Sequence, residues 1–307
     1  MIFSYTDKRY NQYSSFLKDK FNAKVYKVTL DAGFSCPNRD GTKSFGGCIF
    51  CDDSGSFSNA HDNLLPIEEQ LEIGITRLKN RFKAEKFISY FQAYTNTYAS
   101  VEHLKKVYDS AFSHPDVIGI SIGTRPDCVD KEKISLISSY AQNHYVWVEY
   151  GLQSIHNKTL QAVNRGHSFE DFVHAVEITK NNNINICAHV ILGLPGETKE
   201  DMLNTARILS KMGINGVKIH LLCVLKGTKL EQIHNDGMYT PLEENEYVET
   251  VCDFLELLSP EITIHRLAGN GLKKILVAPR WLPEKFRILT MIDRELEKRN
   301  SFQGCFY

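Results

Sequence analysis

Three cysteines lie close together near the start of the chain: Cys36, Cys48 and Cys51. Their spacing, C-x11-C-x2-C, gathers three thiols on one Gly-rich loop, where thiolates can hold a metal centre. Two centres fit this pattern. A zinc ion would take His61 as its fourth ligand, whereas a [4Fe-4S] cluster held at three irons would keep the fourth iron open. The spacing alone favours these two about equally, and a redox-active CxxC pair is a weaker third interpretation.

The composition is that of a folded globular protein. The chain has 307 residues, 42% of them hydrophobic and 24% charged, which excludes a fibre or a disordered tail. No apolar run approaches the roughly 18 residues that span a bilayer, and no signal-peptide core follows Met1. We therefore expect a cytoplasmic protein with no membrane partner. The eight cysteines are too sparse for a secreted disulfide scaffold, and the five outside the loop are expected to be small buried hydrophobic residues.

Apolar runs and amphipathic segments alternate along the chain, as they do in parallel βα units. We predict strands at residues 24–30, 87–93, 117–122, 145–150, 184–192 and 216–222, with a weaker seventh at 261–266. Helices are predicted at 7–20, 66–81, 100–113, 130–142, 168–182, 198–212 and 243–258. A complete barrel needs eight strands and about 250 residues, so the pattern predicts an α/β fold with a partial, open (β/α)6 barrel. This barrel would span 24–240, between an N-terminal helical extension at 1–23 and a C-terminal extension at 241–307.

The unusual residues follow the predicted strands. Cys36 comes after the first strand, and later strands are followed by polar or Gly-rich segments, such as 93–98, 123–127 and 193–197. In a parallel βα barrel these positions meet at one rim, where catalytic groups collect. We therefore expect one composite site. Because a purely structural zinc ion has no reason to lie on that rim, the location favours the iron–sulfur cluster.

Lys218 and His220 alternate with apolar residues on the sixth predicted strand, so their side chains share one face. A satisfied core histidine is the usual explanation of such a pattern. Inside a barrel, however, the same face points toward a substrate, and the pair is then a candidate for catalysis. Both explanations stay open at this point.

Charge is unevenly distributed, although the formal net charge is only −1. Residues 1–30 contain six Lys/Arg and two Asp/Glu, residues 77–86 contain five and one, and residues 262–300 contain nine and four. Residues 240–261 hold seven acids and no Lys or Arg. Solvated helix faces and a nucleic-acid surface explain these patches about equally well.

Several longer motifs resemble one known family. Asp31-Ala-Gly-Phe-Ser-Cys-Pro-Asn-Arg-Asp-Gly41, Tyr90-Phe-Gln-Ala-Tyr-Thr-Asn-Thr-Tyr98 and His189-Val-Ile-Leu-Gly-Leu-Pro-Gly-Glu197 closely resemble the YhcC/YtqA-type proteins of the radical S-adenosylmethionine (SAM) superfamily. The likeness runs over nearly the whole chain. The segment 218–228 is also similar to the radical SAM half of the Elongator catalytic subunit, whose acetyltransferase half has no counterpart here.

The resemblance implies two cofactors and a set of site residues. Cys36, Cys48 and Cys51 would hold a [4Fe-4S] cluster, SAM would bind the fourth iron through its amino and carboxylate groups, and reductive cleavage of SAM would give a 5′-deoxyadenosyl radical. The SAM contacts carried over from the family are Phe50 beside the adenine, Thr95 or Asn96 at the amino group, Glu149 and Gln153 on the ribose side, Arg165 at a carboxylate, and Leu192, Gly193 and Pro195 along the adenine wall. The family's Gly-Gly-Glu after the second strand is absent, and Ala93-Tyr-Thr-Asn-Thr97 stands in its place.

The resemblance also implies a substrate. An enzyme of this type would modify a wobble uridine in tRNA, converting a carboxymethylaminomethyl side chain to aminomethyl. The basic N- and C-terminal segments would contact phosphates around the rim, and flavodoxin or ferredoxin would supply electrons. Two alternatives remain: a radical SAM enzyme that acts on a small metabolite or peptide, and a zinc-stapled nucleic-acid-binding protein without catalysis.

Overall fold

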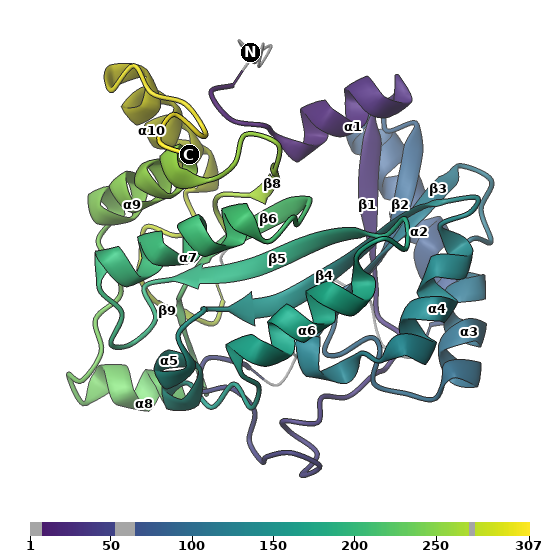
Figure 1. Ribbon diagram of the computed structural model, residues 1–307, viewed down its shortest axis with the longest axis horizontal. Coiled ribbons are helices and arrows are strands. Elements are labelled where there is room, and N and C mark those ends of the chain that lie inside the picture. Colours follow the sequence, from purple (N-terminus) through teal and green to yellow (C-terminus); the bar gives the residue numbers. More distant parts are fainter. Residues whose placement is uncertain (1–7, 53–64, 270–273) are drawn as a thin grey trace.

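Seven parallel strands form one curved sheet in the computed structural model (Figure 1), which describes residues 8–52, 65–269 and 274–307. In order across the sheet they are β1 (Val25–Leu30), β2 (Lys86–Phe91), β3 (Val117–Thr124), β4 (Tyr145–Gln153), β5 (Asn185–Leu192), β6 (Gly216–Leu221) and β8 (Thr263–Arg266). Each neighbouring pair is parallel. The α/β half-barrel predicted from the sequence is therefore confirmed, with β8 as its seventh strand.

Most helices connect successive strands and cover the outside of the sheet. The α-helices of the described residues are α1 (Tyr13–Phe21), α2 (Ile67–Phe82), α3 (Val101–Ser110), α4 (Lys131–Tyr140), α5 (Asn157–Ala162), α6 (Phe169–Thr179), α7 (Lys199–Lys211), α8 (Lys229–Asn235), α9 (Glu244–Leu257) and α10 (Lys285–Lys298). A short 3-10 helix, η1 (Pro126–Cys128), follows β3, and β7 (Val224–Leu225) pairs antiparallel with β9 (Leu276–Ala278). Apolar side chains between the sheet and the outer helices form the main core.

Local sequence signals set the starts of two outer helices. Ser168 and Thr198 cap α6 and α7 through capping boxes, in which the hydroxyl accepts a hydrogen bond from the amide three residues later. The helices predicted at 168–182 and 198–212 agree with these elements to within three residues. The sequence does not predict α5 and α8, which have only 6 and 7 residues and show too little of a helical period.

Strand β4 differs from its prediction in a way that affects the site. It was expected at 145–150, but it continues to Gln153, with an irregular register against β5 between Gly151 and Gln153. Gln153 therefore lies at the end of the strand, and Glu149 lies inside it, as the predicted range already implied. Its carboxylate accepts a hydrogen bond from the hydroxyl of Ser121 on β3, so it faces the inside of the half-barrel.

Helix α1 closes the end of the half-barrel at which the strands begin. The ring of Tyr13 stacks on His265 of β8, with 3.8 Å between ring centroids, and packs edge-on against Trp147 of β4. The ammonium of Lys20 lies over the ring of Tyr145, at the start of β4. The cysteine loop follows β1 and lies at the opposite end (Figure 1). The basic residues of α1 therefore do not surround the rim, which corrects the expectation that the N-terminal segment contacts RNA there.

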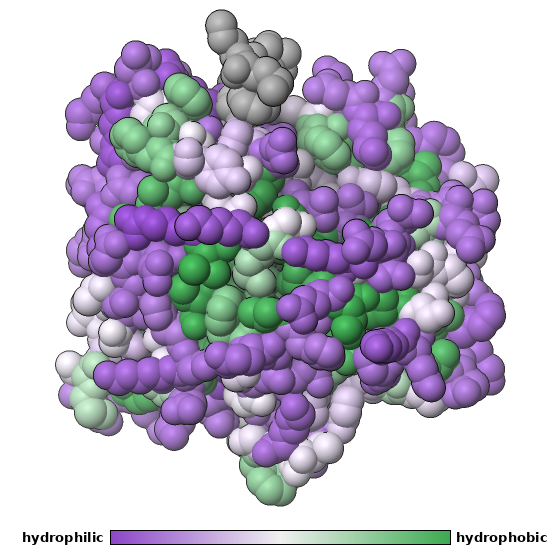
Figure 2. Space-filling view, in the orientation of Figure 1, coloured by the Kyte–Doolittle hydropathy of each residue, from purple (hydrophilic) through white to green (hydrophobic). Residues whose placement is uncertain are grey.

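The face of the molecule in Figure 2 is mostly hydrophilic, with hydrophobic side chains gathered near its middle. In the described ranges, no helix is both long enough and apolar enough to cross a membrane. The division of the chain into 1–23, 24–240 and 241–307 stays a prediction.

Candidate active site

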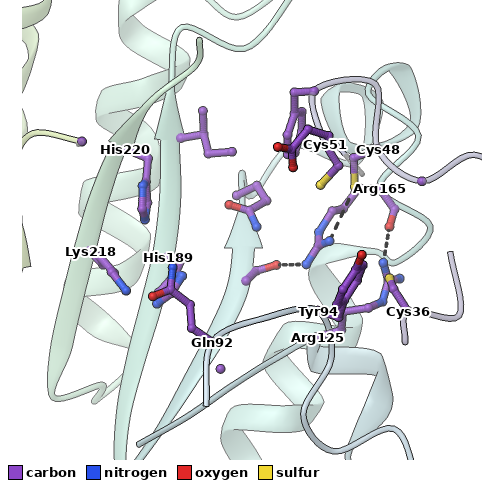
Figure 3. A pocket seen from close by; sticks show the side chains of 18 of the residues that line it. Cys36, Cys48, Cys51, Gln92, Tyr94, Arg125, Arg165, His189, Lys218 and His220 are labelled. Atoms are coloured by element: carbon purple, nitrogen blue, oxygen red, sulfur yellow. Dashed lines mark hydrogen bonds between the residues drawn. The ribbon is translucent and has the colours of Figure 1, made fainter. Parts of the chain in front are cut away.

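A cavity lies inside the half-barrel, beside the cysteine loop. Ten of the fourteen predicted site residues line it: Cys36, Cys48, Phe50, Cys51, Thr95, Glu149, Gln153, Arg165, Lys218 and His220. Figure 3 shows two groups of side chains in this cavity. One group, here called the cysteine end, contains the three cysteines with Arg125 and Arg165. The other, the strand end, contains His189, Lys218 and His220 from β5 and β6.

The cysteine loop, residues 31–52, makes two tight turns around its thiols. The amide of Arg39 donates to the carbonyl oxygen of Cys36 (2.8 Å), and the amide of Cys51 donates to that of Cys48 (3.0 Å). Between these turns Gly47 has a φ of +73°, a left-handed conformation that glycine adopts without steric cost. The glycines noticed in the sequence therefore allow the chain to fold back and bring all three thiols to the cavity.

Asn164, in the turn after α5, anchors the loop to the half-barrel. Its side-chain amide donates to the carbonyl oxygen of Gly47 (2.7 Å), and its own carbonyl accepts from the side chain of Asn38 (2.6 Å). Gly166 leaves the space that Asn38 fills, because a Cβ at residue 166 would lie 2.3 Å from Asn38 Oδ1. The position of the loop thus depends on the turn at 164–166.

Cys48 lies next to a positively charged group. Nη1 of Arg165 is 3.6 Å from its sulfur, and Nδ2 of Asn38 is 3.8 Å away. A hydrogen bond from Cys51, together with the charges of Arg165 and Arg125, lowers the pKa of Cys48 to about 5 although the thiol is buried. Cys48 is therefore a thiolate at neutral pH, and the thiolate is the form that binds metals.

Arg165 is held in place by several hydrogen bonds. Its Nη2 donates to the carbonyl oxygen of Gly151 (2.7 Å), and its Nε bonds to His167 (2.9 Å). Its own carbonyl oxygen accepts from Arg125 (2.8 Å), which in turn forms a buried ion pair with Asp127 (2.9 Å). The predicted contact of Arg165 with a carboxylate stays a prediction, and its bond to Cys48 is one that the sequence does not reveal.

The distances among the three thiols do not distinguish zinc from an iron–sulfur cluster. Cys51 donates a hydrogen bond to Cys48, so these two thiols are close neighbours. Among the described residues, the sulfurs of Cys36, Cys48 and Cys51 do not form a group whose atoms all lie within 4.8 Å of one another. The choice between the two centres therefore rests on the family to which the chain belongs. His61, the predicted fourth zinc ligand, lies outside the described residues.

Glu149 is the centre of a buried hydrogen-bond network at the strand end. Its side chain is fully buried and pairs with the ammonium of Lys27. It also accepts from Ser121 (2.6 Å), His189 (2.6 Å) and Lys218 (3.2 Å). Burial would raise the pKa of Glu149, but the Lys218 and Lys27 charges and the His189 bond hold it well below its ordinary value. Four donors fill the lone pairs of a carboxylate, which favours an electrostatic role over the predicted ribose contact.

Lys218 and His220 both line the cavity, as expected if their shared face points inward. The ammonium of Lys218 donates to the hydroxyl of Tyr90 (2.7 Å) as well as to Glu149. Burial lowers its pKa to about 8. Burial also lowers the pKa of His220 well below its ordinary value, so this imidazole is neutral at pH 7. Their catalytic role stays a prediction.

Four predicted contacts lie away from the cavity wall. The side chain of Asn96 is fully buried and donates to the carbonyl oxygen of Gly123 (2.8 Å). Leu192 packs in the main core and Ile191 lines the cavity instead, because side chains of a strand alternate between its faces. Gly193 and Pro195 also lie outside the lining.

Three charged residues near the site were not assigned a site role from the sequence: Lys27, Arg125, which belongs to the rim segment 123–127, and Arg266. Lys27 pairs with Glu149, and the other two line the cavity. A signal for Lys27 was available, since it interrupts the otherwise β-branched and apolar strand Val25–Leu30. Arg125 directly follows β3, at the position where functional groups collect in such barrels.

Two family models match the chain. The model of the radical SAM superfamily matches residues 38–234, which include Cys48, Cys51 and the strands β2 to β6. The chain belongs to the radical SAM superfamily. A radical SAM C-terminal domain model matches residues 214–298. This confirms the family inferred from the motifs.

The relatives of this radical SAM protein are of two kinds. It is 40% identical to YtqA of Bacillus subtilis over 305 residues, covering 99% of this chain and 95% of YtqA. It is 31% identical to a tRNA uridine(34) acetyltransferase of Methanocaldococcus infernus over 156 residues, covering 50% of this chain but only 28% of that protein. The solved structure of the M. infernus Elp3 superposes with a TM-score of 0.67 and 19% identity, covering 92% of this chain and 64% of that one, which supports the fold.

Membership of the superfamily identifies the protein as a radical SAM enzyme whose cofactors are a [4Fe-4S] cluster and SAM. The described residues fit this cofactor pair. The cavity has thiols and arginines at one end and continues to the strand end, so it offers a cluster site and space beyond that site.

Proposed function

We propose that this radical SAM enzyme modifies a wobble uridine in tRNA, converting a carboxymethylaminomethyl side chain to aminomethyl. The observation that carries the proposal is the similarity, over half of the chain, to a tRNA uridine(34) acetyltransferase. A tRNA substrate would place the reaction in the cytoplasm, with flavodoxin or ferredoxin as the electron donor. The alternative of a small metabolite or peptide substrate is an outcome of the test below.

In this proposal the cysteine end binds the cofactors. Cys36, Cys48 and Cys51 hold the cluster, and the bonds that Arg165 and Asn38 donate to Cys48 keep its thiolate oriented toward the cavity. When bound, the cluster and SAM together supply a 5′-deoxyadenosyl radical that removes a hydrogen atom from an unactivated carbon. Such chemistry requires shielding from water, and the cavity wall includes the buried side chains of Cys48, Glu149 and Lys218.

The middle of the cavity binds SAM. Phe50 offers an aromatic surface beside Cys51, and Thr95 and Gln153 offer polar groups from the ends of β2 and β4. Gln153 has a φ of +75°, which is unusual for a residue other than glycine, and such strained positions are frequent at ligand sites. These three residues are thus assigned to SAM and not to the substrate.

The strand end binds the side chain of the uridine. Lys218 and His220 lie on β6 next to His189 of β5, whose ring centroid is 5.5 Å from that of His220. A neutral His220 can donate a hydrogen bond through one ring nitrogen and accept through the other. Lys218 and His220 can therefore both form hydrogen bonds to a polar group of the substrate.

Exposed cations near the cavity offer a surface for phosphates. Lys226 follows β7, Lys274 precedes β9 and Arg280 follows it, and all three side chains are exposed. Strands β7 and β9 are paired, with the amide of Lys226 donating to the carbonyl oxygen of Ile275 (2.7 Å). We call Lys226, Lys274 and Arg280 the rim patch. It belongs to the region of the chain that reaches the cavity through Arg266 and Leu282.

Mass spectrometry of tRNA nucleosides from a strain that lacks this protein tests the proposal. The expected result is accumulation of carboxymethylaminomethyl uridine and loss of aminomethyl uridine or its derivatives. Complementation with the wild-type gene should restore the normal nucleosides, and complementation with Cys48→Ala should not. An unchanged nucleoside profile would refute the tRNA proposal and favour a metabolite or peptide substrate.

Binding of tRNA in vitro provides a second test. Each phosphate contact contributes about 0.7 to 0.9 to the slope of log K against log salt. Replacing all three residues of the rim patch by Gln should therefore reduce this slope by about 2 to 3. A matched triple variant at Lys18, Lys20 and Lys83, at the opposite end of the half-barrel, should leave the slope unchanged.

A further inference from the structure

The strand end of the cavity carries more positive than negative charge. Lys218 and Arg266 line the cavity there, and Lys27 forms an ion pair with Glu149. Among the described residues that line the cavity, the carboxylates are Glu149 and Asp52. Asp52 belongs to the cysteine loop, where its carbonyl oxygen accepts from Arg39 (2.6 Å). Glu149 is therefore the carboxylate available to balance three cations.

Glu149 cannot balance them all. Its oxygens already accept from Lys27, Ser121, His189 and Lys218, and two of these donors are full cations. The three histidines nearby do not alter the balance, because burial lowers the pKa of each of them. At neutral pH the network of Glu149 with its two lysines thus has a net charge of about +1 before Arg266 is included.

Arg266 adds a further positive charge beside Lys218. The two residues are register partners on the neighbouring strands β6 and β8. Within the described ranges Arg266 forms no ion pair with a carboxylate, and its charge depresses the pKa of Lys218 and of Lys285. Adjacent cations in a partly buried site are unfavourable unless an anion lies between them. An anion bound in the cavity could contact both side chains and balance their charges, because both line the cavity.

We propose that Lys218 and Arg266 form an anion site that binds a carboxylate on the substrate. The inference rests on the proposed function in one respect, since a carboxymethylaminomethyl group ends in such a carboxylate. The guanidinium fork of Arg266 matches the two oxygens of a carboxylate, and the ammonium of Lys218 adds a point charge. Anchoring this end would hold the adjacent carbon atoms in the space between the strand end and the cysteine end.

The burial of the site favours a terminal carboxylate over a phosphate of the RNA backbone. Lys218 is only 5% exposed, so only a slender end group reaches it, whereas a backbone phosphate carries two ribose units. The cysteine end has its own cations, Arg125 and Arg165, for ligands bound there. The anion site is therefore assigned to the substrate.

The first experiment tests the site without RNA. Crystals of the anaerobically purified holoenzyme are soaked in bromide, and an anomalous peak is expected between Lys218 Nζ and the Arg266 guanidinium. The peak should be lost in Arg266→Gln and retained in Arg280→Gln, which removes an exposed arginine of the same region. Absence of the peak from the wild-type protein would overturn the proposal.

The second experiment identifies the anion. Two RNA hairpins of the same sequence carry at the wobble position either carboxymethylaminomethyl uridine or its neutral amide. The holoenzyme should bind the carboxylate form about tenfold more tightly, a difference of about 1.4 kcal/mol, and Arg266→Gln should abolish the preference. Equal affinities of the wild-type protein for the two hairpins would overturn the assignment to a substrate carboxylate. A bromide peak without binding of either hairpin would support the anion site and refute the tRNA proposal.

Discussion

Arg165 donates a hydrogen bond to the sulfur of Cys48 over 3.6 Å, and both side chains are buried. The donor is held from the other side by Gly151 and His167, so it does not move freely. Hydrogen bonds and positive charge near ligand sulfurs are among the factors that set the reduction potential of an iron–sulfur cluster. Arg165 is thus a positioning residue for the cluster ligand.

Replacing Arg165 by Gln should lower the midpoint potential of the cluster. Reduction adds negative charge, which a nearby guanidinium stabilises, so its loss makes reduction harder. A shift on the order of 60 mV corresponds to a tenfold change for one electron. Anaerobic redox titration followed by EPR measures it. Arg207→Gln, at an exposed ion pair on α7, is the control and should leave the potential unchanged. A shift toward higher potential in the Arg165 variant would contradict the assignment.

Cys48→Ala should abolish production of 5′-deoxyadenosine while the fold is retained, because the loop contributes few residues to the main core. Chromatography of the reaction products and circular dichroism measure these two properties. The wild-type protein should contain about four irons per chain. Cys305→Ala removes a thiol at the far end of the chain and should keep both iron and activity. Retained cleavage of SAM by the Cys48 variant would exclude this residue as a ligand.

Gly166→Ala should impair assembly of the cluster. The new Cβ would lie 2.3 Å from Asn38 Oδ1, which displaces the cysteine loop. Gly196→Ala is a matched control, since Gly196 has a similar φ (+81° against +74°) but no atom within 4 Å of the added Cβ. Both variants carry a backbone cost of about 1 to 2 kcal/mol. Iron content after reconstitution should fall to half or less of the control value, and equal iron in the two variants would show that the loop tolerates the change.

Glu149→Gln should lower the free energy of unfolding by about 3 to 5 kcal/mol, the usual effect of leaving buried charges without a partner. The affected cations are Lys27 and Lys218, which face this carboxylate inside the half-barrel. Chemical denaturation measures the change. Glu200→Gln, in an exposed pair with Arg207, should alter stability by less than about 1 kcal/mol. Similar stability of the two variants would mean that the network contributes little.

Binding of a carboxylate-bearing RNA should weaken as the pH rises through about 8, where Lys218 loses its proton. Glu149 stays ionised over this range, because its pKa is lowered, and Arg266 keeps its charge. The affinity should therefore fall several-fold between pH 7 and pH 9. In Lys218→Arg the profile should be flat, since a guanidinium does not titrate there. A flat profile in the wild-type protein would exclude Lys218 from the anion site.

Features encoded by short stretches of sequence were predictable. The spacing of the three cysteines indicated a metal-binding loop, and the apolar run at 184–192 predicted β5 to within one residue. The side of a strand that each side chain faces was harder to predict than the strand itself. An error of one position turns a side chain to the other side of a strand, which is why Leu192 was expected at the cavity and Ile191 lies there.

Contacts between distant strands were not predictable from spacing. Lys27 and His265 are 238 positions apart along the chain, yet Nζ of one lies 3.5 Å from Nδ1 of the other. Only the curvature of the sheet brings β1 and β8 close enough for this contact. The same curvature brings Arg266 and Glu149 to the wall of one cavity. The charge balance of the strand end therefore cannot be predicted from the spacing of these residues in the sequence.

The two edge strands of the sheet, β1 and β8, have no ladder between them, and the N-terminal segment joins them. The amide of Ile264 donates to the carbonyl oxygen of Asn11 (2.7 Å), and α1 packs on both strands. Among the described residues, none from 8–21 lines the cavity. The segment 11–21 therefore bridges the open side of the half-barrel without lining the cavity. A deletion within this bridge is expected to alter the spacing of β1 and β8 while leaving every residue of the cavity wall in the sequence.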